Sequence, residues 1–321
     1  MKKGSIKQVS EQILKYDQIV IFHHIRPDGD CLGAQFGLKK LIEDNFPNKK
    51  VYAIGDAQNS FSFMNLEHDT IPSDEFLKNS LAIIVDANFK DRIECRYLLD
   101  ENKFAAIIRI DHHPNDDDLN STALWVDSSY VAACEQVAHL AIRNKWKISA
   151  KAAEYIYLGI YTDSGRFLFN NTSWRTLLLT SKLWKSKMEV NKIHQNLTKT
   201  SLNDIQFNAY IHSNFKVYKN VSYYLINLEE QKRFNKTPNQ ATRPNLIANI
   251  EGFNIWLSFT QEKENSWRVE LRSNGPNVRE IAVKWGGGGH LNASGAMIDS
   301  ISKIDNILED CQKQIEIWKN N

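Results

Sequence analysis

The most constraining feature of the sequence is an alternation, through its first half, of short apolar runs with helical patterns. Runs rich in Val, Ile, Leu and Ala have the length of buried strands at residues 18–22, 81–85 and 104–110. Helical patterns occupy residues 31–43 and 132–143. Strands that alternate with helices predict a mostly parallel sheet covered by helices. Such open α/β sheets place their ligands at the carboxyl ends of the strands.

In the second half of the chain, the pattern of predicted strands and helices changes. Residues 174–187 have an amphipathic helical pattern, and the polar stretch 190–203 predicts a connecting helix and a linker. Strand-like runs follow at 215–217, 222–228, 254–260 and 267–272, before a glycine-rich loop and a closing helix at 302–319. We therefore predict an α/β fold with a larger domain over residues 1–188, a linker over 189–210 and a smaller α/β domain over 211–321. A chain of 321 residues with 42% hydrophobic residues is large enough for two cores.

Charge and cysteine content restrict the class of protein. The net charge of +2 is too small to indicate nucleic-acid binding by itself, so affinity for polyanions must come from local groups. Four scattered cysteines without a C-x-x-C pair predict a reduced, intracellular protein. No apolar run approaches the roughly 18 residues of a membrane span. We expect a cytoplasmic protein without a membrane partner. A homodimer is expected only because two-fold dimers are the commonest symmetric oligomers.

An imidazole and two carboxylates follow the first predicted strand. They are His24, Asp28 and Asp30, separated by residues that include Pro27 and Gly29. Their position suits a ligand site. The alternative is that Asp30 only caps the following helix and that His24 is a surface residue.

Carboxylates and imidazoles also follow the other two strands. Asp86 ends the second run, and Asp111-His112-His113 directly follows the third. A single Asp at a strand end is more often a cap or turn residue. Two adjacent imidazoles after a buried strand are harder to explain in that way, because they need polar partners.

A fourth polar cluster, Asp163-Ser164-Gly165-Arg166, follows an apolar stretch at 155–161 and is compatible with either a helix-end turn or a site. Taken together, the segments supply a mixed nitrogen and oxygen ligand set: His24, Asp28, Asp30, Asp86, His112 and Asp163. This set suits Mn²⁺ or a related divalent ion, with Mg²⁺ and Co²⁺ as alternatives. Two such ions could share a carboxylate, generate hydroxide and stabilise both oxygens of an in-line phosphoryl displacement.

The second predicted domain contains a different type of motif. Four consecutive glycines, 286–289, precede His290, and glycine backbone can approach an anion closely. Arg272 and Ser273 end a predicted strand just before this loop, and a guanidinium can bind phosphate in a fork. The alternatives are a flexible turn for the glycines and a solvated side chain for Arg272.

These motifs together resemble the DHH/DHHA1 phosphoesterases. The four N-terminal motifs are similar to the DHH motifs, whose name matches Asp111-His112-His113. Leu271-Arg272-Ser273 and residues 286–290 are similar to the DHHA1 substrate-binding domain. Within the family, the compact layout is most similar to the NrnA-type bifunctional oligoribonucleases and 3′-phosphoadenosine-5′-phosphate phosphatases.

The resemblance implies a role for each matched residue. One ion would be held by His24, Asp28, Asp86 and Asp163, and the other by Asp30, Asp86, His112 and Asp163. His113 would handle protons beside the ions, and Asp111 would orient its neighbours. The catalytic residues would thus be Asp86, His112, His113 and Asp163. Phosphate of the substrate would be bound by Arg272, Ser273, Gly287, Gly288, Gly289 and His290, with Arg166 as an additional contact.

The implied activity is hydrolysis of very short RNA (nanoRNA) to mononucleotides and of 3′-phosphoadenosine 5′-phosphate to AMP, by a two-metal-activated hydroxide. Alternatives within the family are a cyclic or linear dinucleotide phosphodiesterase, a short single-strand DNA exonuclease and a pyrophosphatase, although the last would lack the loop at 286–290. A non-catalytic nucleotide- or RNA-binding module is the alternative of another class. A serine or cysteine hydrolase is disfavoured because there is no G-x-S-x-G motif, and Cys31 is interpreted as a small packed residue.

Overall fold

The computed structural model describes residues 2–113 and 116–320 of the chain. Contacts within the chain divide it into two compact units, residues 1–198 and residues 199–321. Each unit contains one six-stranded sheet. The predicted α/β fold, with a mostly parallel and helix-covered N-terminal sheet, is confirmed. Within the described residues, no helix is long and apolar enough to cross a membrane.

The N-terminal sheet has the strand order β1-β6-β5-β4-β2-β3. All neighbours pair in parallel except β1, which is antiparallel to β6. The strands are β1 (Lys2–Gly4), β2 (Gln18–Phe22), β3 (Lys50–Ala53), β4 (Leu81–Val85), β5 (Ala106–Asp111) and β6 (Ala123–Asp127). Sequence analysis identified β2, β4 and β5. The short edge strands β1 and β3 were not predicted, nor was β6, which lies between β1 and β5.

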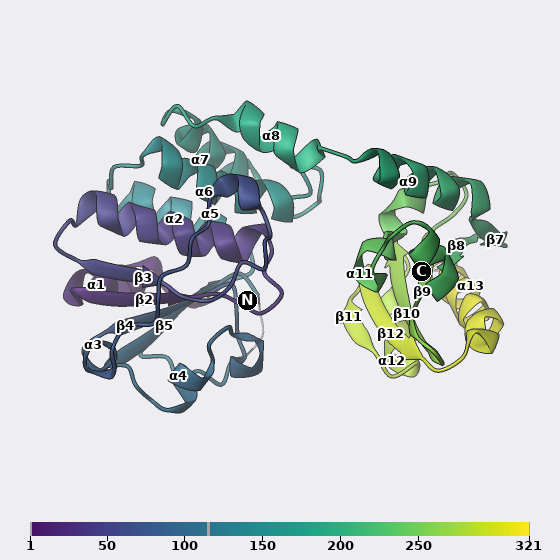
Figure 1. Ribbon diagram of the computed structural model, residues 1–321, viewed down its shortest axis with the longest axis horizontal. Helices are drawn as coiled ribbons and strands as arrows, with labels where there is room; N and C mark the ends of the chain where they lie inside the picture. The colour runs from purple at the N-terminus through teal and green to yellow at the C-terminus, as the bar shows by residue number, and fades with distance from the viewer. Residues whose placement is uncertain (1, 114–115, 321) are drawn as a thin grey trace. The chain divides into compact units, whose positions relative to one another are not determined.

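Helices cover both faces of this sheet (Figure 1). The helices of the unit are α1 (Ile6–Lys15), α2 (Gly29–Asn45), α3 (Asp74–Lys78), α4 (Tyr97–Asp100), α5 (Ala133–Arg143), α6 (Ala150–Asp163), α7 (Trp174–Trp184) and α8 (Val190–Thr198). Ile19 and Ile21 of β2 pack with α1, α2, α5 and α6, whereas Val20 and Phe22 pack on the other face with α3 and α4. Because both faces are covered, the central strands are apolar throughout rather than alternating.

The C-terminal sheet has the order β11-β12-β10-β9-β8-β7, in which only β8 and β9 pair in parallel. Its strands are β7 (Lys216–Tyr218), β8 (Val221–Ile226), β9 (Ile255–Lys263), β10 (Ser266–Ser273), β11 (Gly288–His290) and β12 (Ala293–Ile298). The unit's helices are α9 (Leu202–Asn214), α10 (Leu228–Arg233), α11 (Pro238–Ala241), α12 (Val278–Lys284) and α13 (Ile304–Asn320). Helices α12 and α13 pack on one face, and α9 and α11 on the other.

The predicted glycine loop at 286–289 is partly a strand. Gly288 and Gly289 belong to β11, whose backbone pairs with Gly295 and Ser294 of β12. Glycine has low strand propensity, so the sequence pattern did not predict this pairing. The glycine segment is therefore the edge of a sheet rather than a free loop.

Three glycines allow α2 to pack closely on α6. Gly29, Gly33 and Gly37 are four residues apart and so lie on one face of α2. A Cβ atom on Gly29 would lie 2.4 Å from Thr162 Oγ1, and one on Gly33 would lie 2.4 Å from the carbonyl oxygen of Tyr155. The close approach brings the start of α2 next to the end of α6.

We expect Gly33→Ala to destabilise the protein by about 1–3 kcal/mol, because its methyl group must displace the backbone of α6. The midpoint and slope of urea denaturation would measure the change. Gly288→Ala is the matched control, since a Cβ there would have no atom within 4 Å. Equal denaturation midpoints for the two variants would contradict the close-packing explanation.

Candidate metal centre

The polar motifs meet at the carboxyl ends of three adjacent strands. After β2 the chain crosses to β3 on one side, and the next strand, β4, lies on the other side of β2. Such a switch in direction opens a crevice at the strand ends. Phe22 is level with Ile84, so His24 and Asp86 leave β2 and β4 at the same level. His112 directly follows β5, which pairs with β4.

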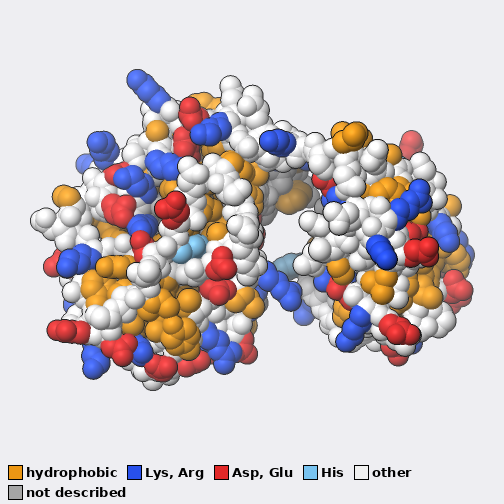
Figure 2. Space-filling view, in the orientation of Figure 1, with side chains coloured by type: hydrophobic (Ala, Val, Ile, Leu, Met, Phe, Trp, Pro, Cys, Tyr) orange, Lys and Arg blue, Asp and Glu red, His pale blue; other side chains and the backbone are white. Residues whose placement is uncertain are grey.

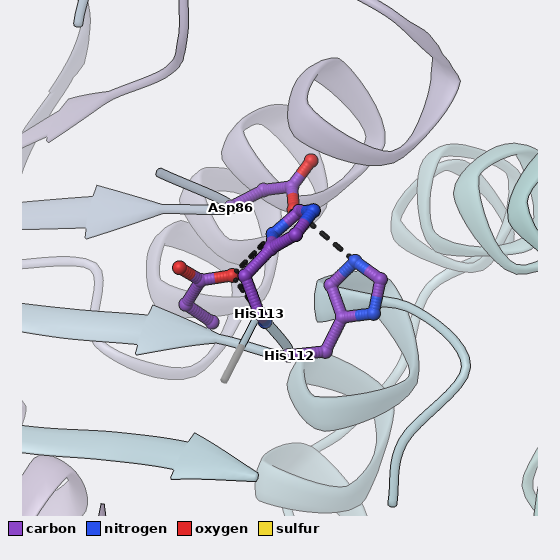
Figure 3. A group of neighbouring side chains, drawn as sticks. Asp86, His112 and His113 are labelled. Carbon is purple, nitrogen blue, oxygen red and sulfur yellow. Dashed lines mark hydrogen bonds and ion pairs between the residues drawn. The ribbon is translucent and has the colours of Figure 1, made fainter. Parts of the chain in front are cut away.

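Asp86 occupies the middle of the cluster. Its side chain is 3% exposed, and its backbone has a φ of 55° while its N–H donates to the carbonyl of Ile110. A left-handed conformation is uncommon for a residue other than glycine, and such backbone strain clusters at functional sites. One carboxylate oxygen lies 3.4 Å from His24 Nε2, and the other lies 3.3 Å from His112 Nε2. Figure 3 shows Asp86, His112 and His113 converging at the strand ends.

His24 and Asp28 form one side of the cluster. When His24 Nδ1 donates to the carbonyl of Ile25 at 2.9 Å, Nε2 is left as an acceptor, 3.5 Å from Asp28 Oδ2. The other oxygen of Asp28 accepts the N–H groups of Asp30 and Cys31 at the start of α2. Asp28, not Asp30, is therefore the helix cap, and the alternative that Asp30 only caps the helix is wrong.

Asp30 and Asp163 form the other side. The fully buried Asp30 carboxylate accepts the N–H groups of Ala133 and Cys134 at the start of α5, at 2.6 and 2.8 Å. Asp163 is the last residue of α6. His112 Nε2 lies 3.7 Å from Asp30 and 3.5 Å from Asp163. The structure thus brings all six predicted ligands into one cluster, linked through Asp86 and His112.

The clustered carboxylates strongly shift one another's pKa values. Burial, reinforced by the charge of Asp86, raises the pKa of Asp30 to about 7. Burial, with the charges of Asp30 and Asp86, also raises the pKa of Asp163 well above its ordinary value. Although burial opposes its charged form, the neighbouring Asp86 carboxylate raises the pKa of His112 to about 9. Despite its own burial, Asp86 has a pKa held below the usual range by His112, His113 and His24. The cluster therefore lacks sufficient positive charge to ionise all its carboxylates.

A divalent cation fits these residues. Asp86 Oδ1 and His112 Nε2 are buried, and among the described residues their ion-pair contacts at 3.3 Å do not meet hydrogen-bond geometry. Three groups of ligand atoms lie close enough to share an ion: Asp86 with Asp111, His112 and His113; His24 with Asp28 and Cys31; and Asp30 with His112 and Asp163. Buried polar atoms without partners are costly, and coordination would satisfy them.

His113 is held beside the cluster by Asp111. His113 Nδ1 lies 2.9 Å from Asp111 Oδ1 and 3.3 Å from Asp86 Oδ1. Burial opposes protonation, but the hydrogen bond to Asp111 and the nearby Asp86 carboxylate raise the pKa of His113 to about 10. The buried Arg109 donates from Nε to the other oxygen of Asp111 at 3.0 Å. Arg109 was not predicted as a site residue, although an arginine inside an otherwise apolar strand indicates a buried carboxylate partner.

Arg166 lies on a strained turn three residues beyond Asp163. Gly165, Arg166 and Phe167 all have φ values between 54° and 65°, and the Arg166 side chain is exposed. Two consecutive non-glycine residues in this region are unusual, and such strain is often found at ligand sites.

The remaining predicted residues lie in the C-terminal unit. Ala293 of β12 is paired on one side with Arg272 of β10 and on the other with His290 of β11. Directly opposed residues of antiparallel strands project to the same face. Arg272 and His290 therefore share one face of the sheet, on either side of a small side chain. Arg272 Nη1 also contacts Glu270 Oε2 at 3.0 Å.

Ser273 and the glycines differ in their surroundings. The Ser273 hydroxyl donates to the carbonyl of Pro276 at 2.6 Å and accepts from Asn292, which are contacts within the fold. A Cβ on Gly287 or Gly289 would collide with the backbone of β12, at 2.0 and 2.6 Å. Gly288 has open space where a Cβ would lie, as does Gly286, whose φ of 77° disfavours other residues.

Comparison with known proteins gives consistent matches along the chain. A model of the DHH family, N-terminal domain, matches residues 18–160, and a model of the DHHA1 domain matches residues 221–316. The chain is 53% identical to the bifunctional oligoribonuclease and PAP phosphatase NrnA of Mycoplasma pneumoniae, over 98% of each chain. It is 34% identical to the protein of that name from Bacillus subtilis, over 97% of this chain and 98% of the relative.

A solved structure supports the fold. An exopolyphosphatase-related protein from Bacteroides fragilis superposes with a TM-score of 0.83 at 24% identity, covering 98% of this chain and 96% of that one. The chain belongs to the DHH family of phosphoesterases and carries its DHHA1 domain.

Proposed function

We propose that this protein is a metal-dependent phosphoesterase that degrades very short oligoribonucleotides to mononucleotides and converts 3′-phosphoadenosine 5′-phosphate to AMP. The observation that carries the proposal is the buried Asp86 carboxylate, which lies 3.3–3.4 Å from the imidazole nitrogens of His24, His112 and His113. The high identity to relatives named for both activities supports this choice of substrates. Both reactions break a phosphate ester at a 3′ oxygen, so one site would suffice.

Two divalent ions would be held by the six clustered side chains, with Asp86 and Asp163 shared between them. Mn²⁺ is our first choice because the set mixes imidazole nitrogens with carboxylate oxygens, and Mg²⁺ or Co²⁺ are the alternatives. When bound, such ions supply hydroxide at neutral pH and neutralise charge on the phosphoryl oxygens.

His113 would handle the proton of the leaving group. Its Nδ1 is engaged by Asp111 and Asp86, and these contacts favour the imidazolium form. Arg109 fixes Asp111, so the ring of His113 has a defined orientation. A held imidazolium can donate a proton to the departing 3′ oxygen, which is the role of a general acid.

The C-terminal unit would bind a phosphate of the substrate. Arg272 and His290 project to one face of the sheet, and Gly288 leaves open space beside them in the register of β11. Ser273, Gly287 and Gly289 would shape this region. In the N-terminal unit, Arg166 would contact phosphate beside Asp163. On the visible face of each unit, basic and acidic side chains are interspersed (Figure 2), so the affinity would depend on these few groups.

A cytoplasmic location fits the thiols. Cys31, Cys95, Cys134 and Cys311 are all free, which is typical of a reducing compartment. A homodimer is proposed as the assembly, because two-fold dimers are the commonest symmetric oligomers.

Short RNAs from dimer to pentamer and 3′-phosphoadenosine 5′-phosphate should be hydrolysed rapidly with Mn²⁺, and a long single-stranded RNA slowly. EDTA should abolish both activities. Asp86→Asn should lower both by on the order of 100-fold or more, because it removes the shared carboxylate charge. Release of nucleotides and phosphate would be measured, with the exposed Asp74→Asn as the control.

Several outcomes would contradict this assignment. Turnover of cyclic dinucleotides or of long strands alone would place the protein elsewhere in the family. Binding of short RNA without metal-dependent turnover of any substrate would favour a binding module.

Without metal, the free energy of unfolding of the wild type should fall as the pH rises from about 4 to about 7, and it should fall more than that of Asp30→Asn. The folded state holds the Asp30 proton more tightly than the unfolded chain, so this contribution disappears above the folded pKa of about 7. Divalent ions bind deprotonated ligands, so the rise in Tm on adding Mn²⁺ should be larger near pH 8 than near pH 5.5. Thermal denaturation in EDTA and in Mn²⁺ would test both statements; a Mn²⁺ effect independent of pH would contradict them.

Gly288→Ala should raise the KM for both substrates by about tenfold while leaving Tm unchanged. Among the described residues no atom lies within 4 Å of the added methyl group, so a ligand in close approach would meet it. An unchanged KM would show that this position does not contact the substrate.

A further inference from the structure

Cys31 lies among the predicted metal ligands. Its Sγ, a ring nitrogen of His24 and a carboxylate oxygen of Asp28 all lie within 4.8 Å of one another. The side chain is fully buried in the first turn of α2. The interpretation of Cys31 from sequence as a small packed residue therefore leaves out its position beside two candidate ligands.

Local hydrogen bonds hold the sulfur in this position. The backbone N–H of Asp28 donates to Cys31 Sγ at 3.4 Å, while the Asp28 carboxylate accepts the N–H of Cys31. The reciprocal pair is a capping box, which fixes both side chains at the start of the helix. The thiol is therefore turned toward the Asp28 side of the cluster.

A buried carboxylate also faces His24. Asp86 is 97% buried, and its Oδ1 faces His112 and His113 at 3.3 Å. Its other oxygen lies 3.4 Å from His24 Nε2, the ring that Asp28 also faces. His24, Asp28 and Cys31 thus provide nitrogen, oxygen and sulfur donors close to one another, and Asp86 faces the same imidazole.

We propose that Cys31 Sγ is a further ligand of the ion held by His24 and Asp28, so that this half of the centre prefers a thiophilic ion such as Zn²⁺ or Co²⁺ to Mn²⁺. Soft thiolate donors favour these ions, whereas carboxylates and water suit Mn²⁺. Coordination would replace the S–H bond by a sulfur–metal bond and release the proton to solvent. The inference rests on the proposed metal centre, and it assigns the two ion positions different chemistry.

Cys134 provides a matched control. It is equally buried, and its Sγ donates to the backbone carbonyl of Asp30 at 3.3 Å. Its sulfur lies against α6, where a Cβ on Gly159 would be 2.3 Å away. Among the described residues it belongs to none of the groups of ligand atoms that could hold an ion.

The test is titration of the metal-free, full-length protein with Co²⁺, followed by absorption spectroscopy of the wild type, Cys31→Ser, Cys31→Ala and Cys134→Ser. The wild type and Cys134→Ser should show visible d–d bands and a near-ultraviolet thiolate-to-Co²⁺ charge-transfer band. Both Cys31 variants should keep the d–d bands and lose the charge-transfer band. In Cys31→Ser the affinity for Zn²⁺ should fall at least about tenfold, and that for Mn²⁺ less than about threefold.

The outcomes separate this inference from the proposed function. Absence of d–d bands in the wild type would overturn the metal centre itself. Wild-type d–d bands without a charge-transfer band, or a band that persists in the Cys31 variants, would overturn only the role of Cys31. Equal losses of Zn²⁺ and Mn²⁺ affinity in Cys31→Ser would show that the thiol only caps the helix and does not bind the ion. If neither Cys31 variant folds, the wild-type and Cys134→Ser spectra still decide whether a thiolate binds.

Discussion

The N-terminal unit depends on the burial of several carboxylates at one edge of a sheet. Burial opposes their ionisation, and each ionised carboxylate opposes that of its neighbours. The protein offsets this partly with three imidazoles, partly with Arg109 on Asp111, and partly with the backbone N–H groups that Asp30 accepts at the start of α5. These partners hold the carboxylates in place without neutralising them all, which leaves a defined position for added positive charge.

Helix packing supplies the second half of this arrangement. The parallel strands bring His24, Asp86 and His112 together, but Asp163 belongs to a helix that covers the sheet. The glycine face of α2 lets α6 approach until the two helix ends meet. The absence of side chains at the glycines of α2 therefore determines how close the Asp163 carboxylate of α6 lies to the strand ends. Because the backbones of α2 and α6 are close, burial and the charges of Asp30 and Asp86 raise the pKa of Asp163.

Much of the fold and cluster followed from local sequence patterns, because buried parallel strands are apolar and their ends lie at one edge. Strands β2, β4 and β5 and the side chains after them were predicted for that reason. The pairing of β11 with β12 was not, because it depends on backbone contacts between residues of low strand propensity. Arg109 and Cys31 acquire their roles only through tertiary neighbours. The domain limits at residues 188 and 211 stay a prediction, as do the individual roles of the site residues.

The spacing of the clustered side chains along the chain has a consequence for synthesis. The first lies at residue 24 and the last at residue 163, near the end of the larger unit. A nascent polypeptide cannot complete the cluster until α6 has left the ribosome. All six clustered side chains therefore precede the C-terminal unit in the order of synthesis, so the cluster can form before that unit has been made.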